Sequence, residues 1–266
     1  MVRLVNEYFT KLTGQTFVIT NQTGIAGYEQ THQANTDGYN FIDGTTTILT
    51  SKEDGTLSYD WSDYAMVAFI EGNYNTVIAV EADSPYQTIN DLLDAAKAPD
   101  SKVTGGVTMS GQPYLFAKAL AAKTGIDLYY VDVGNTSERN AALLGGQVDY
   151  IITNTTAAQA YVDSGDFRFI AIDGNERYEL APDVPTFKEQ GVDFCFVSQP
   201  TIWLAPKGTS EDTCEAMNAI LAKIWADPNF KEDMRGLNAI VYAMPSVSES
   251  TTIAQQYAEE LAPYIK

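Results

Sequence analysis

Four short segments of this sequence combine threonine, serine and asparagine directly after residues typical of a β-strand. Their hydroxyl, amide and backbone groups form hydrogen bonds without carrying a formal charge, which suits a carboxylate held by neutral donors. The segments are Gly44–Thr47, Thr108–Gln112, Gly134–Ser137 and Thr153–Thr156. The candidate ligand contacts taken from them are Thr46, Thr47, Thr108, Ser110, Gly111, Gln112, Asn135, Thr136, Ser137, Thr153 and Asn154.

Each of these segments also has a purely structural interpretation. Threonine, serine and asparagine are the residues that commonly cap the N-terminus of a helix, and for any single segment capping is the preferred explanation. Pro113 suits the first turn of a helix, so the backbone N–H groups before it would face outward. It is the recurrence of four such segments at corresponding places that favours a ligand-binding cleft.

The elements that position these loops alternate between strand and helix along almost the whole chain. Strands are expected at residues 17–19, 39–42, 64–70, 76–80, 103–108, 128–133, 150–152 and 167–172. Helices are expected between most of them and over much of the chain after residue 211. This succession predicts parallel sheets covered by helices, with ligands bound outside the carboxyl ends of the strands.

The composition excludes several functions. With 16 Lys+Arg against 35 Asp+Glu, the net charge of -19 repels nucleic acid and anionic lipid, and no apolar run is long enough to cross a bilayer. The single histidine, His32, is expected on a helix surface, and neither a nucleophile–base set nor metal-ligand spacing is present. We therefore expect no enzyme, no cofactor or metal, no nucleic-acid partner and no membrane insertion by this chain.

A few residues near the polar loops leave alternatives open. Arg139, beside Ser137, is the one cation that could reach a second carboxylate, although a surface arginine is the preferred interpretation. The scarcity of basic residues argues against a highly charged ligand such as citrate. Tyr74 and Tyr114 are the tyrosines best placed to line a cleft. Two buried thiols explain Cys195 and Cys214 better than a disulfide does.

Several motifs, in a fixed order, resemble those of one known family. They are NQTGIAG at residues 21–27, DGY at 37–39, LLGGQVD at 143–149, PDVPT at 182–186 and WLAPKGT at 203–209. In this order and spacing the chain resembles, over essentially its whole length, the periplasmic binding proteins of tripartite tricarboxylate transporters, the Bug or TctC-like family. The family's ligand loops then fall on residues 106–112, 134–136 and 152–154.

The resemblance implies an α/β, two-lobed type II periplasmic-binding-protein fold with mostly parallel sheets flanked by helices. Residues 1–99 plus 206–266 would form one lobe and residues 100–205 the other, with the ligand cleft and hinge between them. Such a protein captures a small organic carboxylate outside the cytoplasm, as a periplasmic protein or cell-surface lipoprotein. It delivers this ligand to the membrane permease subunits of its transporter.

The chain departs from the family pattern in several places. Thr153 replaces an aspartate used by members that hold amino groups, Gln112 stands where a serine begins the family's SxxH motif, and Gly134 stands where it has lysine. Met1 aligns within the helix that follows the family's opening strand and glycine-rich loop. We therefore expect the first strand of the first lobe, and the export signal, to be missing from this chain.

Two other functions remain open at this stage. A binding protein of this kind can also deliver its ligand to a sensory membrane receptor. The same two-lobed fold occurs in enzymes, but no pair of carboxylates is placed in the polar loops to act as acid and base. The identity of the carboxylate is left open.

Overall fold

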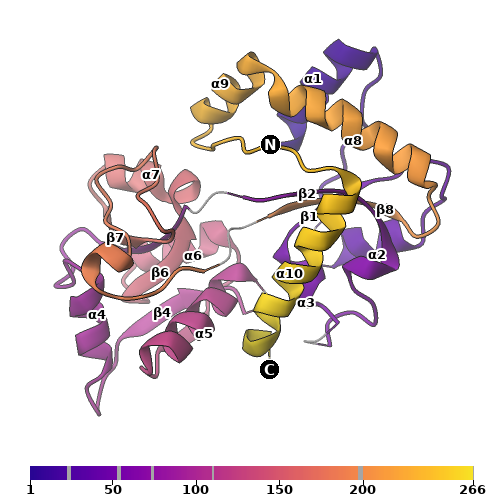
Figure 1. The fold of residues 1–266 in the computed structure, drawn as a ribbon. Coiled ribbons are helices and arrows are strands. Elements are labelled where there is room, and N and C mark those ends of the chain that lie inside the picture. Colours follow the sequence, from indigo (N-terminus) through magenta and orange to yellow (C-terminus); the bar gives the residue numbers. More distant parts are fainter. Residues whose placement is uncertain (23–24, 53–54, 73–74, 110, 197–199, 266) are drawn as a thin grey trace. The chain divides into compact units, whose positions relative to one another are not determined.

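Two separate β-sheets, each with its own helices, organise the chain (Figure 1). The computed structural model describes residues 1–22, 25–52, 55–72, 75–109, 111–196 and 200–265. The chain divides into two units: Met1–Gly72 with Gln199–Lys266, and Asn73–Ser198. Residues 75–99 therefore lie in the second unit and residues 200–205 in the first, whereas the sequence placed each in the other lobe. The reason is that β3 (Thr76–Glu81) pairs with two strands of the second sheet and β8 (Thr201–Pro206) with two strands of the first.

The sheet of the first unit has the order β1-β8-β2. Strands β1 (Ile42–Gly44) and β2 (Tyr64–Ile70) are joined through the short helix α3 (Thr46–Thr50) and the 3-10 turn η1 (Trp61–Asp63). Strand β8 (Thr201–Pro206) lies between them and is antiparallel to both. Strands β1 and β2 therefore run in the same direction, as a strand–helix–strand connection requires, but they do not pair with each other.

Helices cover both faces of this first sheet (Figure 1). One face carries α1 (Val2–Thr13) and α8 (Glu211–Ala226), with α9 (Pro228–Gly236) beyond α8; the other carries α3 and α10 (Val247–Ile265). Helix α2 (Ala26–His32) contacts β1 and β8.

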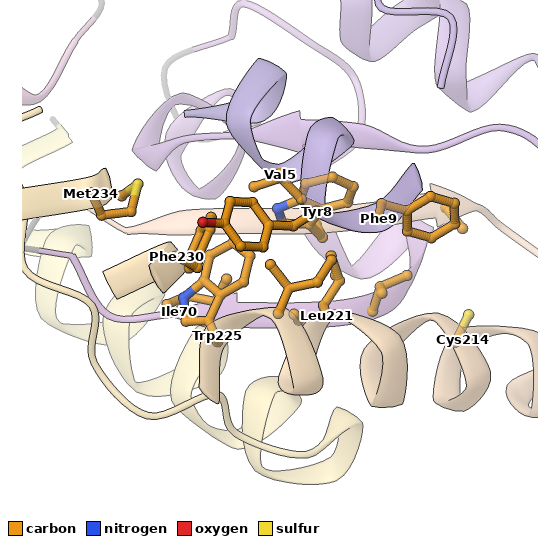
Figure 2. Close-up of a cluster of buried hydrophobic side chains, with 14 residues drawn as sticks. Val5, Tyr8, Phe9, Ile70, Cys214, Leu221, Trp225, Phe230 and Met234 are labelled. Atoms are coloured by element: carbon orange, nitrogen blue, oxygen red, sulfur yellow. The ribbon is translucent and has the colours of Figure 1, made fainter. Parts of the chain in front are cut away.

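The core between α1, α8, α9 and the sheet is aromatic (Figure 2). Val5, Tyr8 and Phe9 occur at helical spacing and form the buried stripe of α1. The ring of the fully buried Phe230 meets that of Tyr8 edge-on, with 5.3 Å between their centroids. The centroid of the Trp225 ring lies 5.0 Å from that of Phe230. These contacts fix α1 and α9 against α8.

The sheet of the second unit has the order β5-β4-β6-β3-β7. Strands β4 (Thr104–Val107), β5 (Tyr129–Asp132) and β6 (Tyr150–Asn154) are parallel neighbours, whereas β3 is antiparallel to β6 and to β7 (Phe167–Ile172). The helices of this unit are α4 (Ile89–Ala96), α5 (Gln112–Thr124), α6 (Thr136–Leu144) and α7 (Thr155–Asp163), with the 3-10 turn η2 (Lys188–Gln190).

Both strand pairs of the first sheet are therefore antiparallel and the second sheet is mixed, although mostly parallel sheets were expected. In each sheet one strand runs against the others: β8 in the first and β3 in the second. These are the strands that follow the two points where the chain passes from one unit to the other. Because the reversed strand lies inside its sheet, both of its own pairings are antiparallel, while the remaining strands keep one direction.

Two expected strands differ in the structure. Residues 17–19 belong to no strand, and the side chain of Val18 is 94% exposed. The strand expected at residues 39–42 lies slightly later, as β1 (Ile42–Gly44), and leaves Tyr39 exposed. The β-favouring composition is present in both cases, but residues 17–19 and 39–41 have no partner strand in the described structure.

Candidate functional site

The carboxyl ends of β4, β5 and β6 meet at one edge of the second sheet, because these three strands are parallel neighbours. Strand β3 begins at the same edge, since Thr76 lies opposite Asn154 in the antiparallel register. Helices α5, α6 and α7 each start there. The edge thus brings together three of the four polar segments found in the sequence, with three positive helix ends.

The N-terminus of α5 is left open for an acceptor. Its N-cap is Gly111, which supplies no side chain, and Pro113 in the first turn has no N–H. The backbone N–H of Gln112 has no acceptor among the described residues, while its side-chain Nε2 donates to Thr76 Oγ1 at 3.0 Å. Ser110, another candidate contact, lies outside the described residues. Backbone donors of this kind form an anion site at a helix N-terminus.

The other two helices are capped by their own asparagines. Asn135 Oδ1 accepts hydrogen bonds from the backbone N–H groups of Ser137 and Glu138 at 2.9 and 3.2 Å, and Glu138 accepts the Asn135 N–H in return. Asn154 Oδ1 accepts the Ala157 N–H at 2.9 Å. The structural interpretation therefore holds for both side-chain oxygens, and only their NH2 groups lack a partner among the described residues.

Buried hydroxyls without partners lie beside these caps. Thr153 and Thr155 are 3% and 0% exposed, and no described atom hydrogen-bonds to either hydroxyl oxygen. The Thr155 N–H donates to Asn75 O at 3.1 Å, which joins α7 to the start of β3. Unpaired buried hydroxyls are costly unless a ligand or water completes them. Asn75 and Thr155 were not among the sequence candidates, although Thr155 lies within the fourth polar segment.

Arg139 is buried, with 4% of its surface exposed, so the surface interpretation was wrong. Its guanidinium donates to Thr108 Oγ1, to Thr136 Oγ1 at 3.2 Å and to Gly134 O at 3.5 Å, and Nε has no partner among the described residues. Thr108 in turn donates its hydroxyl to Gly134 O. Burial lowers the pKa of Arg139 from its ordinary value. The Thr108 hydroxyl thus links the loop after β4 to the loop before α6, and it is also a candidate ligand contact.

The remaining polar segment, Gly44–Thr47, lies in the first unit, at the end of β1. Thr46 is 2% exposed and its hydroxyl oxygen lacks a partner among the described residues, whereas Thr47 is half-buried. The loop is anchored by Tyr28, whose hydroxyl accepts the Thr45 N–H at 3.1 Å. Burial raises the pKa of Tyr28 from its ordinary value. The Gly44–Thr47 segment therefore resembles the second-unit loops, because it also holds a buried neutral hydroxyl, that of Thr46.

Other singled-out residues are structural. His32 stacks on Tyr59 at 4.0 Å between centroids, and Tyr114 meets Tyr130 edge-on at 5.5 Å. Tyr74 lies outside the described residues. Cys195 and Cys214 are free thiols, Cys214 buried and Cys195 half-buried.

The described residues hold no group of three or more His, Cys, Asp or Glu side chains that could bind a metal ion. None of their helices is long and apolar enough to span a membrane.

Comparison with known proteins gives consistent matches. The model of the family described as tripartite tricarboxylate transporter family receptor matches residues 1–265. A protein in the gbd 5' region of Cupriavidus necator is 28% identical over 99% of this chain and 79% of its own length. The R. palustris protein Rpa4515, solved with adipate, is similar in fold, with a TM-score of 0.87 at 22% identity over 99% of this chain and 91% of its own. MatC from Rhodopseudomonas palustris, solved with malate, gives a TM-score of 0.85 at 21% identity over 100% and 93%.

Proposed function

The chain belongs to the family of tripartite tricarboxylate transporter receptors, and we propose that it captures a small organic carboxylate outside the cytoplasm for a transporter of that type. The observation that carries the proposal is the edge of the second sheet where three helix N-termini meet buried hydroxyls that have no hydrogen-bond partner among the described residues. A carboxylate is the small group that such a set of donors completes.

The overall charge of the protein supports a local mechanism of capture. At a net charge of -19, the long-range field repels an anion rather than steering it to the site. Binding must then depend on short-range donors fixed by the fold: the Gln112 N–H at the start of α5, the Thr153 and Thr155 hydroxyls, and the NH2 groups of Asn135 and Asn154. Arg139 hydrogen-bonds to Thr108 in one of these loops and to Gly134 and Thr136 in the next, so both loops are fixed before a ligand binds.

In this proposal the two units are the two lobes of the binding protein, and Thr46 and Thr47 of the first unit complete the set of ligand contacts. The closure of a cleft between the lobes stays a prediction. The protein acts by binding and delivery, not by turnover, and its partners are the permease subunits of the transporter. Its location is the periplasm, or the cell surface as a lipoprotein.

Thermal unfolding against a panel of mono-, di- and tricarboxylates, aromatic acids and acidic amino acids tests this function. A ligand that binds only the folded protein raises the melting temperature by mass action, and we expect a selective rise with one class of carboxylate. The double variant Thr153→Val, Thr155→Val removes two hydroxyls at nearly constant shape and is expected to reduce that rise. Thr251→Val, on the exposed face of α10, is the matched control. A parent protein that bound no acid in the panel would refute the proposal.

A further inference from the structure

Asp173 places a buried carboxyl at the edge of the second sheet where the proposed ligand site lies. Strand β7 ends at Ile172, and Val77 of β3 lies opposite Ile172 on one side and Thr153 of β6 on the other. Strands β6 and β7 are both antiparallel to β3, so their carboxyl ends lie at the same edge. Of the aspartates and glutamates that the structure describes, Asp173 is the least exposed, with 1% of its surface accessible.

Thr76 connects Asp173 to the start of α5. The Asp173 N–H donates to Thr76 O at 2.8 Å, and the Thr76 hydroxyl accepts from Gln112 Nε2 at 3.0 Å. Thr76 also lies opposite Asn154 in the register of β3 and β6. Asp173 and Asn154 therefore lie on either side of Thr76, two strand spacings or about 10 Å apart. A carboxylate bound by the Gln112 N–H and the Asn154 NH2 group lies on the order of 10 Å from Asp173.

The immediate surroundings of Asp173 oppose its ionisation. Its Oδ1 accepts the N–H groups of Gly174 and Phe196 at 2.9 and 2.8 Å, and its Oδ2 has no partner among the described residues. Burial raises the pKa of this carboxyl to about 7, and the two N–H groups and the Cys195 thiol oppose the shift only in part. No lysine or arginine that the structure describes forms an ion pair with it.

Charged side chains in the segments around Asp173 have partners of their own or face solvent. Next to Asp173, β3 presents only the uncharged Thr76 and Val77. Glu176 and Glu179, in the segment after β7, are exposed. The partnered groups are Lys188 with Asn175, Arg177 with Glu189, Lys123 of α5 with Asp193, and Lys118 of α5 over the Tyr114 ring.

Three more charged side chains lie at this edge, next to the start of α6. Arg139 is buried, whereas Asp132 and Glu138 are exposed. Solvent screens exposed charges strongly, so these two carboxylates act weakly on a bound ligand. A charge on the buried Asp173 is screened much less, and its effect on a ligand is correspondingly larger.

We propose that Asp173 makes carboxylate capture depend on pH, so that a ligand binds together with the uptake of a proton by this side chain. This inference rests on the proposed function and adds its regulation. Neutral Asp173 leaves the donors of the edge to balance the ligand, whereas ionised Asp173 repels it. Two unit charges about 10 Å apart, at an effective dielectric constant of about 20 to 40, change affinity about tenfold.

The direction of the pH dependence follows from reciprocal coupling. An anionic ligand binds the protonated form more tightly, and its binding therefore raises the pKa of Asp173 by the same factor. Affinity is highest where Asp173 is protonated and is lost as pH rises through the range near 7.

Calorimetric titration at pH 6 and pH 9 tests the inference. The probe is whichever of succinate, adipate, malate, benzoate and glutamate binds the parent most tightly at pH 6. We expect the affinity of the parent to fall about tenfold from pH 6 to pH 9, relative to that of Asp173→Asn. The variant cannot ionise at this position, so it also corrects for titration of the acid itself. An equal pH dependence in the parent and Asp173→Asn overturns the inference.

Asp83→Asn is the matched control. Asp83 is an exposed aspartate of the same unit and follows the end of β3, at the opposite edge of the sheet. Its replacement also removes one acidic group, and we expect this variant to keep the pH dependence of the parent. A pH dependence reduced equally in Asp83→Asn and Asp173→Asn would show a general effect of charge and would overturn the inference.

Proton uptake by the parent supplies a test that needs no variant. Titrations at pH 7.5 in MOPS and in Tris, which differ in ionisation enthalpy, give the number of protons taken up on binding. With tenfold coupling and a pKa of about 7 in the free protein, we expect about 0.5 proton per ligand. Binding without proton uptake overturns the inference and leaves the proposed function intact, whereas a parent that binds none of the five acids refutes both.

Discussion

Asp173 at the end of β7 makes the stability of the second unit depend on pH. It is 1% exposed, and its Oδ1 accepts the N–H groups of Gly174 and Phe196 at 2.9 and 2.8 Å, while Oδ2 has no partner among the described residues. Burial raises the pKa of this carboxyl from 3.8 to about 7, the Cys195 thiol and the two N–H groups opposing the shift only in part. Ionised Asp173 is therefore costly in the folded protein.

The direction and size of this pH dependence follow from the number of protons that the folded and unfolded states bind. Between pH 4 and pH 7 the folded protein holds a proton on Asp173 that the unfolded chain has lost, so the free energy of unfolding falls as pH rises. The gap between 3.8 and about 7 corresponds to about 4 kcal/mol at 1.36 kcal/mol per pKa unit. Below pH 4 the penalty is absent, and above pH 7 it is complete.

Asp173→Asn isolates this contribution, because the amide oxygen still accepts the two N–H groups but cannot ionise. We expect the free energy of unfolding of the variant, relative to the parent, to rise by about 4 kcal/mol between pH 4 and pH 8. Burial also raises the pKa of Asp43 to about 7, so the difference between the two proteins is the quantity to follow. The unpaired amide NH2 adds a constant offset.

The assay must report on the second unit. All three tryptophans lie in the first unit, so their fluorescence does not report on the second unit; they are Trp61, Trp203 and Trp225. Urea unfolding followed by circular dichroism is combined with hydrogen exchange of the peptide covering residues 167–196. Asp83→Asn, an exposed aspartate of the same unit, controls for the loss of one negative charge. A difference between Asp173→Asn and parent that stays constant from pH 4 to pH 8 refutes the reasoning.

Two further substitutions test the packing of each unit. Phe230→Ala leaves a cavity beneath Tyr8 and Trp225 and is expected to lower the free energy of unfolding by about 3–5 kcal/mol, measured by tryptophan fluorescence in urea; a loss below about 1 kcal/mol contradicts this packing. Gly105→Ala places a Cβ 2.4 Å from Cζ of the buried Tyr150 and is expected to cost about 1–3 kcal/mol by circular dichroism. Gly106→Ala, whose Cβ meets nothing closer than 3.0 Å, is the milder control, and equal losses would count against the overpacking explanation.

The sequence predicted the α/β class and most elements correctly because hydrophobic periodicity and helix caps are local signals, whereas the family was predicted from the resemblance of its motifs. Strand direction is not local. The sequence predicted a strand at residues 76–80 and none at Thr201–Pro206, and nothing in the composition of either run tells which neighbours it pairs with or which way it runs. The same limit explains why residues 75–99 were assigned to the wrong unit. Pairing partners, not propensity, decide both questions.

The site shows a similar division between local and long-range information. Three polar segments met as predicted, since parallel strands carry their following loops to one edge. The burial of Arg139 was missed because a charged residue near a helix start was taken as exposed. A signal was available: Arg139 shares one face of α6 with Ala142 and Leu143, three and four positions later, and all three are buried. A charged residue on the apolar face of a helix is better interpreted as a buried residue than as an exposed one.

Capping and ligand binding are often weighed as alternatives for such loops, but here the caps decide where a ligand finds donors. Asn135 and Asn154 satisfy the first turns of α6 and α7, so those helices offer side-chain NH2 groups and few free backbone donors. Helix α5 begins at Gly111 and keeps the Gln112 N–H available. A ligand carboxylate is thus expected at the start of α5, where no side-chain cap occupies the backbone donor.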